Sequence, residues 1–122
     1  LVPDMGGTVL LREVVSKDVA LDLTLTARVI SGDEAARIGL ITRVADEPLE
    51  EARALVDQIA NRSPDAAAGA KHLFNEAWQA GEGQALAAER RWQLRMLRSR
   101  NQRIAVKRNT KDQQTEYVER SW

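Results

Sequence analysis

The chain has 122 residues, of which 43% are hydrophobic and 30% are charged, and its 18 basic and 18 acidic residues give a formal net charge of zero. This is a globular composition, and the overall charge favours neither a strongly basic nor a strongly acidic partner. Because the chain has no cysteine and a single histidine, His72, the composition excludes disulfides, a cysteine nucleophile and a multi-histidine zinc site.

The first thirty residues predict two short helices and an extended segment. Asp4 can cap a helix that starts near the Gly-Gly pair at 6–7, and apolar residues follow at helical spacing. A second helix is expected over residues 18–26. The segment 28–30 is predicted to be extended.

Helix-capping signals surround the next predicted helix. Ser31 and Glu34 have the spacing of a capping box, and Gly39 is expected to end the short helix that they open. The apolar, β-branched run 40–44 predicts a brief strand. Two isolated strands form no stable sheet by themselves, so we expect them to be edges of a sheet that other residues supply.

Four longer helices are predicted from Pro48 onward. The first is amphipathic, and its predicted buried stripe is Leu49, Ala52, Leu55, Val56 and Ile59. Ser63 is expected to cap the second, with Pro64 at its first position. The predicted inner face of that helix is Ala66, Ala70, Leu73, Phe74 and Ala77. Helices over 84–98 and 100–110 follow, and the polar tail 111–122 is expected to be disordered or docked elsewhere. The fold class is therefore mainly α, with one or two short strands.

Two features favour part of a larger protein. The sequence opens Leu1-Val2-Pro3-Asp4 without a Met, and only 4% of its residues are aromatic, whereas a small domain that folds alone usually has larger core side chains. We therefore expect either a piece of a longer protein or a chain that borrows its core from a partner. The sequence holds no apolar run near 20 residues and no signal-peptide pattern, so we expect a cytoplasmic protein without membrane contact.

Basic residues are concentrated near the C-terminus. Nine basic residues and no acidic one lie between positions 90 and 111, namely Arg90, Arg91, Arg95, Arg98, Arg100, Arg103, Lys107, Arg108 and Lys111. This stretch is either a solvated helix face that packs against acidic parts of the molecule or a site for a phosphate-bearing ligand. Nucleic acid is less favoured, because few aromatic residues are present for base stacking.

Three stretches, in this order and spacing, resemble one family. They are residues 1–8 (LVPDMGGT), residues 25–44, which begin LTARVISGDEAARIGL, and the segment Ser63-Pro64-Asp65-Ala66 that leads to Lys71. Together they resemble the second half of the crotonase superfamily, the enoyl-CoA hydratase/isomerase proteins, over about residues 1–108.

The resemblance implies the C-terminal part of an α/β crotonase fold. Residues 1–45 would end the crotonase core, residues 46–110 would form the helical trimerisation and lid region, and residues 111–122 would be a tail. Members of the family bind acyl-CoA thioesters, hold the thioester carbonyl between two backbone amides and move protons with carboxylates. The implied partners are an acyl-CoA substrate, the missing N-terminal half and a homotrimer or dimer of trimers. No metal is implied, and no cofactor beyond the coenzyme A of the substrate.

The resemblance also implies candidate site residues. Asp4 is the catalytic candidate, because the dienoyl-CoA isomerase branch has a proton-transfer carboxylate at this position; alternatively, Asp4 is only a helix cap. Val2, Pro3 and Leu97 are substrate-binding candidates. The CoA-phosphate candidates, on the last helix and just after it, are Lys107, Arg108 and Lys111. The oxyanion hole and the glutamates that hydratases use would precede this stretch, so the 122 residues alone are not expected to catalyse.

Hydratase and double-bond isomerase activity both remain open from the sequence. The alternative from another class is a non-catalytic crotonase relative that serves as a binding or assembly module. We expect Glu34, Gly39 and His72 to have structural roles, and Trp92 and Met96 to belong to the core or to a subunit interface.

Overall fold

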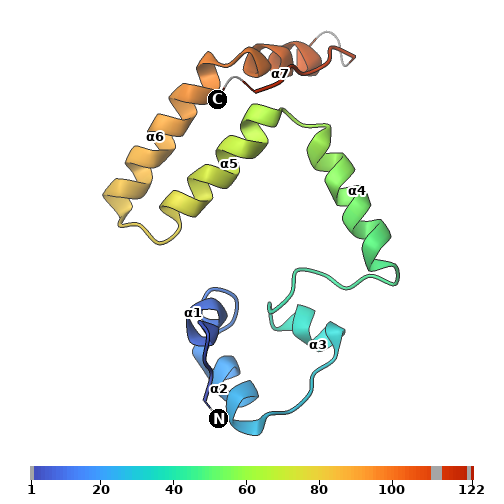
Figure 1. Ribbon diagram of the computed structural model, residues 1–122, viewed down its shortest axis with the longest axis vertical. Coiled ribbons are helices and arrows are strands. Elements are labelled where there is room, and N and C mark those ends of the chain that lie inside the picture. The colour runs from blue at the N-terminus through green and yellow to red at the C-terminus, as the bar shows by residue number, and fades with distance from the viewer. Residues whose placement is uncertain (1, 111–113, 121) are drawn as a thin grey trace. The chain divides into compact units, whose positions relative to one another are not determined.

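The computed structural model describes residues 2–110, 114–120 and 122, and these residues form seven helices and no strand. The chain divides into two compact units, Leu1–Glu51 and Ala52–Trp122 (Figure 1). The predicted fold class is confirmed as mainly helical. The predicted strand at 40–44 is wrong, because that segment, like the extended segment 28–30, has no described strand to pair with.

The first unit contains helices α1 (Gly7–Leu11), α2 (Lys17–Thr26) and α3 (Gly32–Arg37). Gly6, and not Asp4, is the N-cap of α1, and it adopts a φ of 85°, which a residue without a Cβ reaches at little cost. No side chain caps this helix. The predicted Asp4 cap is therefore wrong.

Only one of the two hydrogen bonds of the predicted capping box of α3 forms. The Glu34 N–H donates to Ser31 Oγ at 3.1 Å, as expected, but the Glu34 carboxylate pairs with Arg28 at 2.8 Å. At the other end, Gly39 has a φ of 83° and its N–H donates to the carbonyl of Ala36. This left-handed residue ends α3, which confirms the predicted role of the glycine.

Helix α4 (Pro48–Ala60) begins at the predicted proline, and the boundary between the two units falls inside it. The predicted burial of its apolar stripe is wrong, because all of its residues are exposed; Leu49 and Val56, for example, are 63% and 62% exposed. The amphipathic pattern is present, but among the described residues nothing covers the apolar face.

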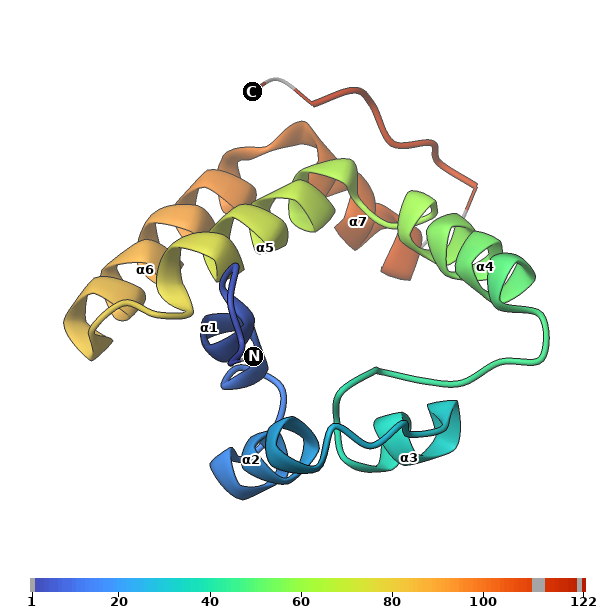
Figure 2. The ribbon, with the colours of Figure 1, turned by 60° about the horizontal axis from the view of Figure 1, so that its bottom comes forward.

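The second unit is built from α5 (Pro64–Ala77), α6 (Glu82–Arg98) and α7 (Arg100–Thr110). Helices α5 and α6 lie side by side and are joined by a short turn (Figure 2). They pack closely at Gly69, where an added Cβ would lie 3.0 Å from the Met96 sulfur and 3.6 Å from the Trp92 ring. Ser99 has an extended backbone between α6 and α7, and its Oγ accepts from the N–H of Gln102.

The buried face of α5 differs from the predicted one. Ser63 caps the helix as expected, since its Oγ accepts from the N–H of Ala66 at 3.3 Å. The buried residues are Asp65 and Gly69, however, whereas Phe74 of the predicted inner face is 58% exposed. The prediction is wrong because α6 packs against α5 at Gly69 and Asn101 of α7 contacts Asp65.

The described part of the C-terminal tail is docked on α6 and α7. The Asn101 side chain donates to Asp65 Oδ2 at 2.9 Å and to the Val118 carbonyl at 2.8 Å, and it accepts from the Val118 N–H at 2.9 Å. Asn101 is only 1% exposed. Trp122 packs beside Trp92, with ring centres 5.4 Å apart. Of the two possibilities for this tail, docking is the one observed.

Candidate functional site

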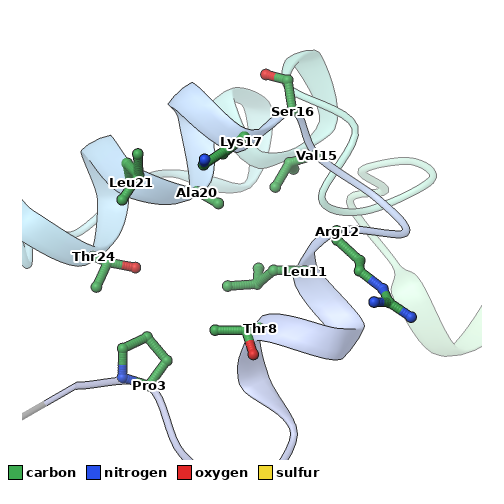
Figure 3. A pocket seen from close by; sticks show the side chains of 10 residues that line it. All are labelled: Pro3, Thr8, Leu11, Arg12, Val15, Ser16, Lys17, Ala20, Leu21 and Thr24. Carbon is green, nitrogen blue, oxygen red and sulfur yellow. The ribbon is translucent and has the colours of Figure 1, made fainter.

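A mostly apolar pocket of about 560 Å³ lies between α1 and α2 in the first unit (Figure 3). Its lining residues are Pro3, Thr8, Leu11, Arg12, Val15, Ser16, Lys17, Ala20, Leu21 and Thr24. Its volume is within the range of pockets that hold small molecules or cofactors.

The chain reversal between α1 and α2 positions the pocket walls. Leu11 and Val15 point toward α2, where Ala20, Leu21 and Thr24 face them (Figure 3). Val15 is 7% exposed and lies at the base of this reversal. The Arg12 guanidinium is directed away from the space between the helices, whereas the Thr24 hydroxyl points into it (Figure 3). The interior is therefore mostly hydrocarbon and suits an apolar ligand.

The three predicted site residues at the start of the chain have different surroundings. Pro3 lines the pocket, and Val2 is 82% exposed. Asp4 is exposed and is not among the lining residues. Its Oδ1 accepts from the Met5 N–H at 2.6 Å, and Oδ2 has no partner among the described residues. Asp4 therefore presents one free carboxylate oxygen next in sequence to a residue that lines the pocket.

Two charged side chains of the first unit, Asp18 and Arg28, are not among the lining residues of the pocket. The Ser16 hydroxyl donates to Asp18 at 2.5 Å, and this hydrogen bond, helped by backbone N–H groups, lowers the pKa of Asp18. Arg28 pairs with Glu34 and Asp22, which raises the pKa of its guanidinium, Glu34 having the larger effect. The two ion pairs of Arg28 connect α2, through Asp22, to α3, through Glu34.

The other predicted site residues belong to the second unit. Leu97 lies near the end of α6 and is 54% exposed. The Arg108 guanidinium lies over the Tyr117 ring, 4.8 Å from its centre, and Lys107 is exposed. Lys111 lies outside the described residues. The structure thus brings Arg108 to the docked tail and does not isolate it as a solvent-facing cation.

Sequence reasoning missed most of the residues that line the pocket. Thr8, Leu11 and Val15 recur at spacings of three and four, and Lys17, Ala20 and Thr24 do the same on α2. This periodicity could have identified the two facing sides, but only once the chain reversal at Ser16 was known. No cluster of three or more potential metal ligands occurs in the described ranges. None of the helices found in those ranges has the length and apolar character that crossing a bilayer requires.

The structural neighbours of this chain are crotonase-fold proteins. The profile of the family described as enoyl-CoA hydratase/isomerase matches residues 1–121. The chain belongs to the enoyl-CoA hydratase/isomerase family.

Among curated proteins, the chain is similar to the probable enoyl-CoA hydratase echA8 of Mycobacterium bovis. The two are 41% identical over 93 residues, which cover 75% of this chain and 36% of that protein. It is also similar to the carnitinyl-CoA dehydratase of Salmonella typhi, at 34% identity over 76 residues, covering 61% of this chain and 29% of that protein. The chain thus spans about a third of the length of these curated relatives.

Solved structures give the same fold. An enoyl-CoA hydratase from Polaromonas sp. JS666 superposes with a TM-score of 0.84 at 30% identity, over 97% of this chain and 47% of that one. An enoyl-CoA hydratase/isomerase from Mycobacterium abscessus, described as putative, superposes with a TM-score of 0.85 at 27% identity, over 98% of this chain and 50% of that one.

Proposed function

We propose that this chain is the C-terminal part of an enzyme that hydrates or isomerises unsaturated fatty acyl-CoA. The observation that carries the proposal is the family match over residues 1–121 in a chain whose Pro3 lines an apolar pocket of about 560 Å³. Such a pocket would take the hydrocarbon part of the substrate. The coverage of 36% of one relative and 47% of one solved chain supports a longer protein.

In this proposal Asp4 is the proton-transfer group. Moving two conjugated double bonds requires removal of a proton at one carbon and return of a proton at a distant carbon, so two separated carboxylates suit the reaction. Asp4 would be one of them, because its Oδ2 has no partner among the described residues. The second carboxylate and the oxyanion hole would come from residues preceding this stretch. Coenzyme A would enter as part of the substrate, with no separate cofactor.

The oligomer is a further part of the proposal. The exposed apolar stripe of α4 would be covered by the rest of the protein or by a second subunit. A homotrimer or a dimer of trimers would supply such a surface.

Asp4→Asn tests the catalytic role sharply. The amide oxygen of asparagine can still accept from the Met5 N–H, so the local turn survives while the proton-transfer group is lost. In the full-length enzyme, we expect turnover of enoyl-CoA or dienoyl-CoA to fall by about 100-fold or more, with little change in thermal stability. Asp46→Asn, an exposed control in a loop, should leave turnover unchanged.

The non-catalytic alternative rests on a different observation. Asp4 does not line the pocket, and one of its oxygens is held by the Met5 N–H, as in a purely structural turn. If Asp4→Asn retains full turnover, Asp4 has no catalytic role. If the full-length protein binds acyl-CoA without turning it over, the binding or assembly module is the better account.

A further inference from the structure

An open groove of about 490 Å³ lies in the second unit, on the C-terminal half of α6. Its lining residues are Arg91, Leu94, Arg95, Arg98, Ser99 and Trp122. The three arginines follow one another at spacings of four and three residues, which places them on one face of the helix. At a rise of 1.5 Å per residue, their backbone positions span about 10 Å along the axis.

The three guanidinium groups differ in the contacts that they make with the rest of the chain. Arg91 pairs with the Glu76 carboxylate. The Arg95 guanidinium lies over the Trp122 ring, 4.5 Å from its centre, and makes no ion pair with a described residue. A guanidinium stacked on a ring keeps its N–H donors at the edge, available to another acceptor. Arg98 has neither a hydrogen bond nor an ion pair within the described part of the chain.

The docked tail completes the groove. Trp122 is the lining residue furthest from α6 in sequence, and it is held by Trp92, His72 and Arg95. The surrounding sequence makes the electrostatic potential at the groove more positive, since positions 90–111 hold nine basic residues and no acidic one. Glu76 pairs with Arg91, the first of the three arginines along α6. Arg95 is therefore held against the Trp122 ring, and neither Arg95 nor Arg98 makes an ion pair within the described part of the chain.

We infer that this groove binds a diphosphate group, with Arg95 and Arg98 as its ligands. Guanidinium groups pair with phosphate oxygens in a bidentate manner, and two of them one helical turn apart suit two adjoining phosphates. These arginines are distinct from the CoA-phosphate candidates Lys107 and Arg108, and the inference does not depend on the proposed activity. A polynucleotide is disfavoured, because Trp122, the aromatic residue lining the groove, is already crowded by Arg95 and Arg120.

Titration of the full chain with sodium pyrophosphate tests the inference. Calorimetry should show saturable binding, and Arg98→Gln should weaken it by about tenfold or more, since charge-assisted contacts are the strong ones. The matched control is Arg103→Gln, which removes the same charge from an exposed position on α7 outside the groove and should change the affinity by less than about threefold. Equal weakening by both variants, or no saturable binding, would overturn the inference.

A second measurement needs no variant. In NMR spectra of the unmodified chain, pyrophosphate should shift the indole N–H signal of Trp122 and leave that of Trp78, which does not line the groove, in place. Equal shifts of both signals would contradict a defined site.

Coenzyme A and pyrophosphate then distinguish the source of the diphosphate. If it belongs to the substrate, Arg98→Gln weakens binding of both compounds. If the natural ligand is a free diphosphate, the variant weakens pyrophosphate binding and leaves coenzyme A binding unchanged. Either result supports the diphosphate site, whereas a loss for coenzyme A alone would contradict it.

Discussion

Replacing Asn101 by alanine is the most informative single perturbation of the second unit. Its side chain makes three hydrogen bonds of 2.8–2.9 Å, which hold Asp65 and both backbone groups of Val118. Asp65 is 3% exposed and its other oxygen, Oδ1, already lacks a partner, so Asn101→Ala leaves a buried carboxylate with no described donor.

The expected cost follows from these contacts. Each hydrogen bond contributes about 1 kcal/mol, and a buried acceptor left unpaired costs about 1–3 kcal/mol more. When the tail detaches, the backbone N–H and C=O of Val118 form hydrogen bonds with water, which offsets part of that cost. We expect Asn101→Ala to lower the free energy of unfolding by about 3 kcal/mol, a large share of the 5–15 kcal/mol typical of a domain.

Urea unfolding followed by tryptophan fluorescence measures this loss. All three tryptophans, at positions 78, 92 and 122, lie in the second unit, so the signal reports on that unit. Asn109→Ala, an exposed control on the same helix, should cost less than about 0.5 kcal/mol. Deleting residues 114–122 should destabilise the unmodified chain and add little to Asn101→Ala. Equal stability of the two alanine variants would refute the docking role of Asn101.

Three further predictions concern other contacts. Gly69→Val should destabilise the second unit by about 2 kcal/mol in urea unfolding, because a Cβ there meets the Met96 sulfur at 3.0 Å; unchanged stability would contradict the close packing of α5 and α6. Gly39→Ala should cost about 1–2 kcal/mol by circular dichroism, since the residue has a φ of 83°; a neutral result would argue against that conformation. Arg91, and to a lesser extent Trp92, holds the pKa of Glu76 below its ordinary 4.5, so the stability that Glu76 contributes is present above pH 4.5 and is lost as pH falls through the lowered pKa. Unmodified protein and Glu76→Gln should therefore differ in stability at neutral pH and converge in acid, and a constant difference would contradict the assignment.

Local chemistry made the helix ends predictable. Ser31, Ser63 and Gly39 act through atoms within a few residues of themselves, so the sequence pattern was sufficient. The Asp4 cap failed because Gly6 takes that position, and the Glu34 half of the capping box failed because Arg28 competes for the carboxylate.

Burial was harder to predict than helix formation. The face that α5 buries is decided by where Met96 and Trp92 lie, and that depends on α6, not on the α5 pattern. The stripe of α4 has an ideal amphipathic pattern and yet is exposed, because a pattern states a preference for burial without supplying a partner. The candidate site also contains one residue that the sequence identified and others that only the tertiary structure brings together. Pro3 was identified through the family resemblance, whereas the walls at Leu11 and Leu21 depend on the chain reversal between α1 and α2.

We propose that the pocket between α1 and α2 takes the hydrocarbon part of an acyl-CoA. Photo-crosslinking measures this directly, with the full-length protein, an acyl-CoA that carries a diazirine in its acyl chain, and peptide mapping by mass spectrometry. We expect adducts within residues 3–24 that unlabelled acyl-CoA suppresses. Adducts confined to the exposed face of α4, or labelling that unlabelled acyl-CoA does not reduce, would show that the acyl chain binds elsewhere.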